Sequence, residues 1–253
     1  MPDQYDAIAT LYGKMQYLPA FSIQQPSVEA ILGDITGLRC LDLACGLGRW
    51  SKFLLEKGAA SVTGIDISPL MIEEAAHEAS TSWPVSIRDK VTFRVGDCTK
   101  PRDLGEEGPF DLVFGAWLLN YAATAAEQLS MWRNICANLR PGSFFVGITP
   151  NVHMDPVKQP IEDRYGYAVV PVEKIEDRYK CRLTAYTQPE TVSFEMYHLS
   201  KEVYERGAAE AGLVELKWNG HVISKDGKKT EGYWDAFEKR PSFEICTAKR
   251  SVL

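Results

Sequence analysis

The segment of this sequence best suited to ligand chemistry is a small-residue turn between an apolar stretch and a helical one. The run 40–43 is mostly apolar, Gly46 and Gly48 follow it, and a helical pattern begins at Arg49. Glycines let a backbone approach a ligand closely, and the first turn of a helix offers unpaired N–H groups. We therefore expect a ligand-binding turn in this segment.

An acidic residue at the end of the next apolar stretch indicates what the ligand carries. Asp66 lies 24 residues after Asp42, and a carboxylate at that place suits the two hydroxyls of a ribose. The dinucleotide pattern Gly-x-Gly-x-x-Gly is absent, because its third position counted from Gly46 is Ser51. No P-loop pattern occurs either. The expected ligand is a nucleoside without phosphates.

Strands and helices must alternate to bring these residues to one edge of a sheet. Strand-like runs do alternate with helical patterns between residues 39 and 149, which predicts a parallel sheet with helices on both faces. Ser68 with Pro69, and Thr124 with Glu127, are helix-start signals. The expected strands are 39–44, 61–67, 90–96, 110–116 and 143–149, and the expected helices are 49–57, 68–80 and 124–139.

The segments on either side do not continue this alternation. Residues 1–37 carry helical patterns and are expected to form a lid, and 151–199 are expected to form a small antiparallel insert. The predicted fold class is α/β, a single domain with a Rossmann-like, doubly wound, mostly parallel seven-stranded sheet. The insert strands are expected at 165–172, 179–187 and 192–199, and the last part, 200–253, is expected to add a helix at 200–211, strands at 214–218 and 243–248, and a solvated hairpin at 224–230.

Composition excludes several classes of protein. The chain has 253 residues, 45% of them apolar and 25% charged, so it can bury one large core and is not a low-complexity chain. No apolar run reaches the roughly 18 residues of a membrane helix, and no secretory signal is expected. The net charge of −6 speaks against nucleic acid as a partner. Six cysteines without a Cys-x-x-Cys pair indicate a reducing, cytoplasmic compartment and no metal site.

Five short motifs between residues 38 and 150 resemble those of class I S-adenosylmethionine-dependent methyltransferases, with Ala44 standing where that family most often has glycine. They are Asp42-x-Ala44-x-Gly46-x-Gly48, Gly64-Ile65-Asp66-Ile67-Ser68-Pro69-x-Met71-Ile72, Gly96-Asp97-Cys98, Phe110-Asp111-Leu112-Val113 and Leu139-Arg140-Pro141-Gly142-Ser143. Three further patterns resemble the toxoflavin-synthase-like group, whose members methylate ring nitrogens of small heterocycles. These are Tyr5-Asp6-x-Ile8-Ala9-x-x-Tyr12, Leu118-Leu119-Asn120-Tyr121-Ala122 and Phe194-x-x-Tyr197-x-Leu199-Ser200-x-x-x-Tyr204.

The resemblance implies that 38–150 is a cofactor-binding core for S-adenosylmethionine. Asp66 would hold the ribose hydroxyls, Asp97 would accept from the adenine amino group, and Ala116 would approach the sulfonium. Asp42 would order the turn without touching the ligand. The full set expected to bind the cofactor is Tyr12, Ala44, Cys45, Gly46, Gly48, Asp66, Ile67, Met71, Asp97, Cys98 and Ala116.

Aromatic and amide side chains outside these motifs are the candidates for holding a methyl acceptor. In this fold the N-terminal segment, the segment after the fourth strand and the insert cover the ligand, and aromatic rings there suit a flat acceptor. Each of these residues has core packing or an ordinary turn as its alternative role. The candidates are Tyr5, Tyr17, Trp117, Asn120, Tyr121, Asn151, His153 and Tyr165.

The resulting hypothesis is methyl transfer from S-adenosylmethionine to a small aromatic or heterocyclic acceptor, by N- or O-methylation. Since a sulfonium is already a good leaving group, the protein mainly supplies alignment and a dry site. No general base is identified, and the acceptor atom stays open. Alternatives are a protein or nucleic-acid methyltransferase, and a catalytically silent cofactor-binding protein that acts through a partner. A monomer or a homodimer without membrane contact is expected.

Overall fold

The computed structural model describes residues 9–101, 104, 108–158, 164–223 and 231–252. Its main element is a seven-stranded sheet with the order β3-β2-β1-β4-β5-β10-β9, in which only β10 runs against the other strands. The predicted α/β class and the mostly parallel sheet are confirmed. The strands are β1 Arg39–Leu43, β2 Ser61–Asp66, β3 Val91–Val95, β4 Phe110–Ala116, β5 Leu139–Pro150, β9 Leu213–Asn219 and β10 Phe243–Arg250.

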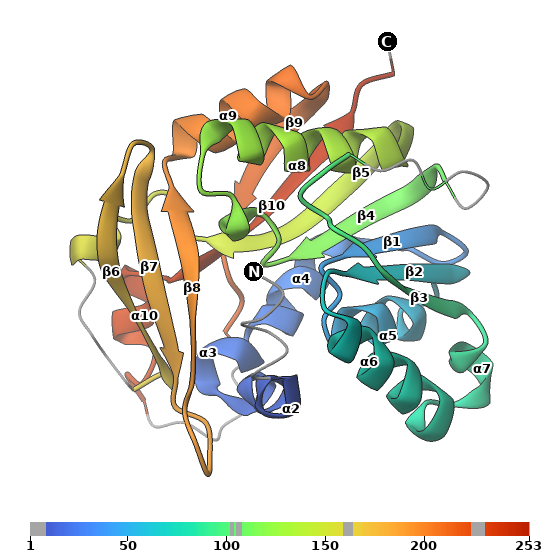
Figure 1. Ribbon diagram of the computed structural model, residues 1–253, viewed down its shortest axis with the longest axis horizontal. Coiled ribbons are helices and arrows are strands. Elements are labelled where there is room, and N and C mark those ends of the chain that lie inside the picture. The colour runs from blue at the N-terminus through green and yellow to red at the C-terminus, as the bar shows by residue number, and fades with distance from the viewer. Residues whose placement is uncertain (1–8, 102–103, 105–107, 159–163, 224–230, 253) are drawn as a thin grey trace.

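Helices cover both faces of this sheet. Figure 1 shows α8 (Ala125–Asn138) and α9 (Lys201–Glu210) on one face, and α5 (Arg49–Glu56) and α6 (Pro69–Ser82) on the other. Each face has its own hydrophobic core, one built around residues such as Trp50 and Phe53 of α5 and the other around residues such as Trp132 of α8. The crossovers that join β1, β2 and β3 therefore lie on one face and the crossover from β4 to β5 lies on the other, as in a doubly wound sheet.

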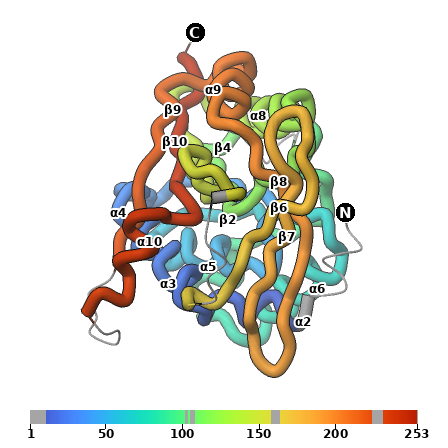
Figure 2. Tube along the Cα trace, turned by 90° about the vertical axis from the view of Figure 1, so that its left-hand side faces the viewer, coloured from blue at the N-terminus to red at the C-terminus, as the bar shows by residue number. Residues whose placement is uncertain are grey.

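The insert predicted between residues 151 and 199 forms a separate three-stranded antiparallel sheet. Its order is β6-β7-β8, and it stands beside the N-terminal helices in both ribbon views (Figures 1 and 2). A third hydrophobic cluster joins it to Met15 and Phe21 of the N-terminal segment. The strands are β6 Tyr167–Ile175, β7 Arg178–Ala185 and β8 Val192–Leu199.

The N-terminal segment, which the sequence predicts to be a lid, contacts this insert. The Ala20 amide donates to the Tyr165 carbonyl at 3.1 Å. Gly166 has a φ of +89°, and a Cβ there would lie 2.9 Å from Leu18, so a side chain at this position would be strained and would collide with the lid. The other end of the lid lies on the glycine turn, since a Cβ on Gly13 would come within 3.1 Å of Leu47.

The helices expected between residues 5 and 36 are short within the described residues. These pieces are α2 (Ala9–Tyr12), η1 (Gly13–Tyr17), α3 (Pro19–Ser22) and α4 (Gln24–Leu32). The break before α3 has a local cause, because Leu18 is extended (φ −71°, ψ 145°) and a residue before proline is disfavoured in the helical region.

Two other local predictions differ from the structure. β5 begins at Leu139 and not at residue 143, because Leu139 already pairs with Phe110 and a register shift then absorbs the Pro141-Gly142 turn. Ser200 precedes α9 without a side-chain capping hydrogen bond, whereas Ser68 caps α6 by accepting from the Met71 amide at 3.1 Å.

The short elements α7 (Val85–Arg88), η3 (Leu119–Tyr121), η4 (Pro156–Lys158) and α10 (Asp235–Lys239) were not expected from the sequence. The expected hairpin at 224–230 lies outside the described residues. None of the described helices is long and apolar enough to span a membrane.

Candidate cofactor and acceptor site

A cavity of about 490 Å³ lies at the carboxyl ends of β1, β2 and β4, beneath the N-terminal lid. Ten of the eleven residues expected to bind the cofactor contribute to its wall: Tyr12, Ala44, Cys45, Gly46, Asp66, Ile67, Met71, Asp97, Cys98 and Ala116. The eleventh, Gly48, is the N-terminal cap of α5 with a φ of +78°, and a Cβ there would lie 2.7 Å from Phe93. Gly48 therefore permits the close packing of the turn and does not face the cavity.

Asp66 connects the end of β2 to the turn after β1. Its Oδ2 accepts from the Gly46 amide at 2.8 Å and its Oδ1 from the Ser68 amide at 2.9 Å. The residue is only 8% exposed, yet it faces the cavity. Each carboxylate oxygen has two lone pairs, so this side chain fits the hydroxyls of a ribose while it orders the turn.

Asp42 lies behind the turn and does not line the cavity. The Ser51 hydroxyl donates to its Oδ2 at 2.6 Å, which connects β1 to α5. Burial raises the pKa of Asp42 from 3.8 to about 7, the hydrogen bond from Ser51 opposes this shift, and the neighbouring charge of Asp66 adds to it.

The segment after β3 presents Asp97 and Cys98 to the cavity. The Thr99 amide donates to Asp97 Oδ1 at 2.9 Å, and Lys100 pairs with Oδ2 at 3.1 Å. Burial by itself would raise the pKa of Asp97, but the hydrogen bonds from Thr99 and Lys100 bring the pKa below its ordinary value. Asp97 is therefore a carboxylate at neutral pH and can accept from an amino group.

Arg49 lines the cavity and was not among the expected site residues. Its guanidinium lies 5.1 Å from the centre of the Trp50 ring. Within the described part of the chain, no carboxylate forms an ion pair with it. Burial lowers the pKa of Arg49, and Tyr12 and Tyr17 partly offset this. Arg49 is half-buried, and a cation withdrawn from water is normally paired, so this arrangement fits a ligand anion. The sequence signal that could have identified Arg49 is its position as a cation directly after the glycine turn.

Aromatic rings form the part of the wall next to the end of β4. Tyr17, Trp117 and Tyr121, three of the expected acceptor residues, line the cavity. Trp117 has a φ of +61°, a strained conformation for a bulky residue that occurs mainly at functional sites. Its Nε1 donates to Gln24 Oε1 at 3.5 Å, and its ring lies 6.4 Å from that of Phe21. Gln24 and Phe21 also line the cavity and were not expected.

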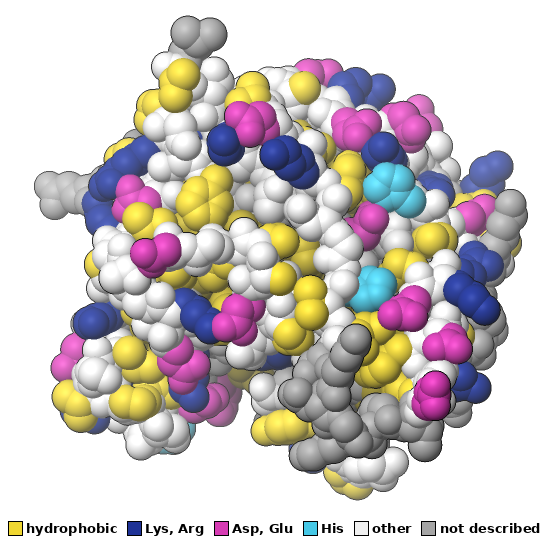
Figure 3. Space-filling model, turned by 180° about the vertical axis from the view of Figure 1, so that it is seen from behind, with side chains coloured by type: hydrophobic (Ala, Val, Ile, Leu, Met, Phe, Trp, Pro, Cys, Tyr) yellow, Lys and Arg dark blue, Asp and Glu magenta, His cyan; other side chains and the backbone are white. Residues whose placement is uncertain are grey.

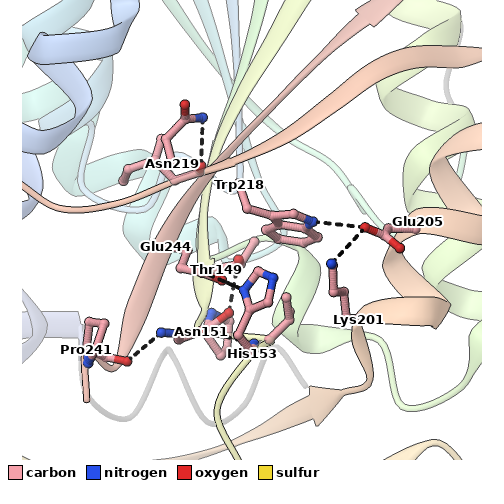
Figure 4. Close-up of polar contacts among 12 residues, drawn as sticks. Thr149, Asn151, His153, Lys201, Glu205, Trp218, Asn219, Pro241 and Glu244 are labelled. Atoms are coloured by element: carbon pink, nitrogen blue, oxygen red, sulfur yellow. Dashed lines mark hydrogen bonds and ion pairs between the residues drawn. The ribbon is translucent and has the colours of Figure 1, made fainter. Parts of the chain in front are cut away.

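The other expected acceptor residues within the described chain lie outside this cavity. Asn151 is 2% exposed, and backbone groups engage its side chain, because its Nδ2 donates to the Pro241 carbonyl and its Oδ1 accepts from the His153 amide. The His153 Nδ1 lies 2.9 Å from Glu244, and its ring meets the Trp218 ring edge-on at 6.0 Å (Figure 4). Tyr5 lies outside the described residues.

Tyr165 and Asn120 are also directed elsewhere. The Tyr165 hydroxyl donates to the Tyr233 carbonyl at 3.0 Å and accepts from the Phe237 amide at 3.1 Å, while its ring stacks on Trp234. These contacts make Tyr165 a packing centre for the C-terminal segment. Asn120 is 1% exposed, and its Oδ1 has no hydrogen-bond partner within the described chain.

The central part of the sequence matches a known family. Residues 40–142 correspond to the family model described as a methyltransferase domain. Residues 40–142 are therefore similar to a methyltransferase domain. This segment holds the glycine turn, Asp66 and Asp97, and therefore most of the cavity wall that lies at the strand ends.

Individual relatives agree with this assignment. The chain is 30% identical to a putative methyltransferase of Bacillus subtilis over 138 residues, covering 54% of this chain and 51% of that protein. It is 28% identical to the demethylmenaquinone methyltransferase of Lactococcus lactis over 173 residues, covering 66% of this chain and 65% of that protein. The match to this chain covers half or less of the length of several other curated relatives.

A solved structure shares the fold of most of the chain. It is an S-adenosylmethionine-dependent methyltransferase from Mesorhizobium loti, with a TM-score of 0.56, 21% identity, and coverage of 90% of this chain and 98% of that one. At this identity, the likeness shows a shared fold.

Proposed function

We propose that the chain transfers a methyl group from S-adenosylmethionine to a small aromatic or heterocyclic acceptor, by N- or O-methylation. The observation that carries this proposal is the composition of one cavity. The ribose- and adenine-type partners Asp66 and Asp97 share it with the aromatic wall of Trp117, Tyr17 and Tyr121. The donor and a flat acceptor would thus lie in one cavity, which supports in-line transfer.

The donor set of the cavity fits the bound cofactor. Asp66 would hold the ribose hydroxyls, Asp97 the adenine amino group, and Arg49 the methionine carboxylate. When bound, S-adenosylmethionine supplies an activated methyl group on a positively charged sulfur. The Trp117 ring would lie against that charge, because aromatic faces attract cations. The lid residues would exclude water from the reacting atoms.

Alignment, and not proton abstraction, is the chain's expected contribution. Burial and the neighbouring charge of Asp66 raise the pKa of Tyr12 to about 12, and burial raises the pKa of Tyr121 well above its ordinary value. Both hydroxyls therefore stay protonated at neutral pH and are poor bases. His153 lies outside the cavity. We propose that the acceptor atom brings its own lone pair, as a ring nitrogen, an amine or an ionised phenol does.

We also propose a division of the chain into four parts of one domain: a lid (1–37), a cofactor core (38–150), an acceptor cover (151–199) and the rest of the sheet (200–253). The toxoflavin-synthase-like motifs and the quinone-type substrate named for the Lactococcus lactis relative support a small ring acceptor. Lys/Arg and Asp/Glu side chains are interspersed on the face shown in Figure 3, which gives no support to a nucleic-acid substrate.

Calorimetry with S-adenosylhomocysteine tests the cofactor half of the proposal. The chain should bind this product, and heat that stays absent at high micromolar ligand would overturn the proposal. A screen of amine, phenol and heterocycle acceptors with labelled methyl groups tests the acceptor half. Tight cofactor binding without transfer to any acceptor would favour a silent protein that acts through a partner.

A further inference from the structure

A buried amide on α8 bonds to the backbone of a cavity residue from the opposite face of the sheet. Asn134 is 1% exposed, and its Nδ2 donates to the Cys98 carbonyl at 3.0 Å. Cys98 lines the cavity, whereas Asn134 does not. Asn134 therefore acts on the cavity only through the backbone of the segment that follows β3.

A second amide fixes the orientation of the first. The Nδ2 of Asn138, which is 4% exposed, donates to Asn134 Oδ1 at 3.1 Å and to the Asn134 carbonyl at 2.8 Å. Because Asn134 Oδ1 is used as an acceptor in this pair, its Nδ2 is the atom that faces Cys98. The assignment of the two amide ends follows from this network.

The peptide between Cys98 and Thr99 transmits this contact to Asp97. Its carbonyl accepts from Asn134, and its N–H donates to Asp97 Oδ1 at 2.9 Å. One planar group thus lies between the α8 amide and the carboxylate that faces the cavity. Hydrogen bonds at both ends of a peptide polarise one another, which strengthens both.

The Cys98 side chain anchors the same segment to two strands. Its thiol donates to the Ile65 carbonyl, with Sγ 3.6 Å from the oxygen, and receives a hydrogen bond from the Ala44 amide. The segment is therefore fixed to the ends of β1 and β2 by Cys98 and to α8 by Asn134. Without Asn134, nothing described would hold the Cys98–Thr99 peptide plane from the α8 side.

We propose that Asn134 is a positioning residue for the purine base of the cofactor: by holding the Cys98–Thr99 peptide, it aims the Asp97 carboxylate at the amino group of adenine. This inference rests on the proposed function, since it requires the cofactor to occupy the cavity. It assigns base selectivity to a residue that touches neither the cofactor nor the acceptor.

Base selectivity is a readout that a merely structural residue would not change. The full chain is titrated with S-adenosylhomocysteine and with S-inosylhomocysteine, in which an oxygen replaces the 6-amino group and cannot donate to Asp97. Asn134→Ala should lower the preference for the adenine compound by about tenfold, the effect of one hydrogen bond to a charged group. Ile135→Val, which trims the neighbouring buried side chain of α8, is the matched control and should leave the ratio within about twofold.

A double-mutant cycle that combines Asn134→Ala with Asp97→Asn tests whether Asn134 acts through Asp97. If Asn134 acts through Asp97, the double variant loses little more selectivity than either single variant. Asn138→Ala keeps the Asn134 amide but removes the hydrogen bond that orients it, so it should show a smaller loss of selectivity. This variant replaces Asn134→Ala in the test if Asn134→Ala does not fold.

A preference ratio unchanged in folded Asn134→Ala, or fully additive losses in the double variant, would overturn the positioning role alone. A wild-type chain that binds neither compound would overturn the proposed function and this inference with it.

Discussion

The Asp66 carboxylate accepts a hydrogen bond from the Gly46 amide at 2.8 Å. One side chain at the end of β2 therefore shapes the backbone turn that follows β1, in addition to facing the cavity. Since Oδ1 is engaged by the Ser68 amide as well, this residue joins the turn, the strand and the start of α6. Its replacement should change both the ligand site and the unliganded fold.

For Asp66→Ala we expect the affinity for S-adenosylhomocysteine to fall by at least about a hundredfold, because each hydrogen bond to a charged group contributes about 1.5–3 kcal/mol. Isothermal titration calorimetry measures this loss. Glu73→Ala, which removes an exposed acid from α6, is the control. Equal affinities in Asp66→Ala and Glu73→Ala would contradict the role of Asp66.

Arg49→Met should weaken S-adenosylhomocysteine more than 5′-methylthioadenosine. The second compound lacks the amino-acid carboxylate, so it should lose little when the guanidinium is removed. We expect a difference of about tenfold or more between the two losses, as for a charge-assisted hydrogen bond. Competition binding with the full chain gives both constants. Equal losses for the two ligands would show that Arg49 does not bind the carboxylate.

Trp117→Leu should reduce the preference for S-adenosylmethionine over S-adenosylhomocysteine. The two compounds differ in the positive charge on sulfur, and a cation–π contact contributes about 0.5–2 kcal/mol, so the ratio of affinities should fall by about threefold or more. Trp234→Leu, which changes a ring that is stacked on Tyr165, is the control. A ratio that is the same in wild type and Trp117→Leu would place the sulfonium away from this ring.

Asp42→Asn should change how stability depends on pH. The folded chain raises the pKa of Asp42 from 3.8 to about 7, so between about pH 4 and pH 7 the folded state holds a proton that the unfolded state has released. The stability contributed by this group is present at low pH and falls as the pH rises through that interval, by at most about 1.4 kcal/mol per unit. The asparagine can still accept from Ser51 but does not titrate.

Urea unfolding at pH 5 and pH 8 measures this effect. The variant should gain stability relative to the wild type on going from pH 5 to pH 8. Asp66 and Cys45 interact electrostatically with Asp42. Both residues are present in the wild type and in Asp42→Asn. A difference between the two chains that stays constant across the two pH values would refute the assignment.

Local sequence patterns were sufficient to predict the core of the fold. The alternation of strand and helix, the capping by Ser68 and the turn at Gly46 depend on neighbouring residues, and the structure has all three. The α/β class followed because strands that alternate with helices at these spacings favour parallel pairing.

The contacts of the remaining side chains depend on residues that are far away in the sequence. His153 pairs with Glu244, 91 residues later, and the Tyr165 hydroxyl bonds to a carbonyl 68 residues later. No periodicity in either segment indicates these contacts, so both residues resembled open candidates for the acceptor site. Likewise, Arg49 has no acidic partner within the described chain, and only the arrangement of the surrounding helices reveals this.

The attachment of the lid to the insert has a consequence for how new specificities arise. Ala20 and Leu18 are secured by Tyr165 and Gly166, whereas the nucleoside half of the cavity is built from the ends of β1, β2 and β3. Exchanging 1–37 together with 151–199 between homologues would thus keep these contacts matched, and Tyr12 of the cavity wall would move with them. Grafting either piece alone would separate Leu18 and Ala20 from the residues that hold them.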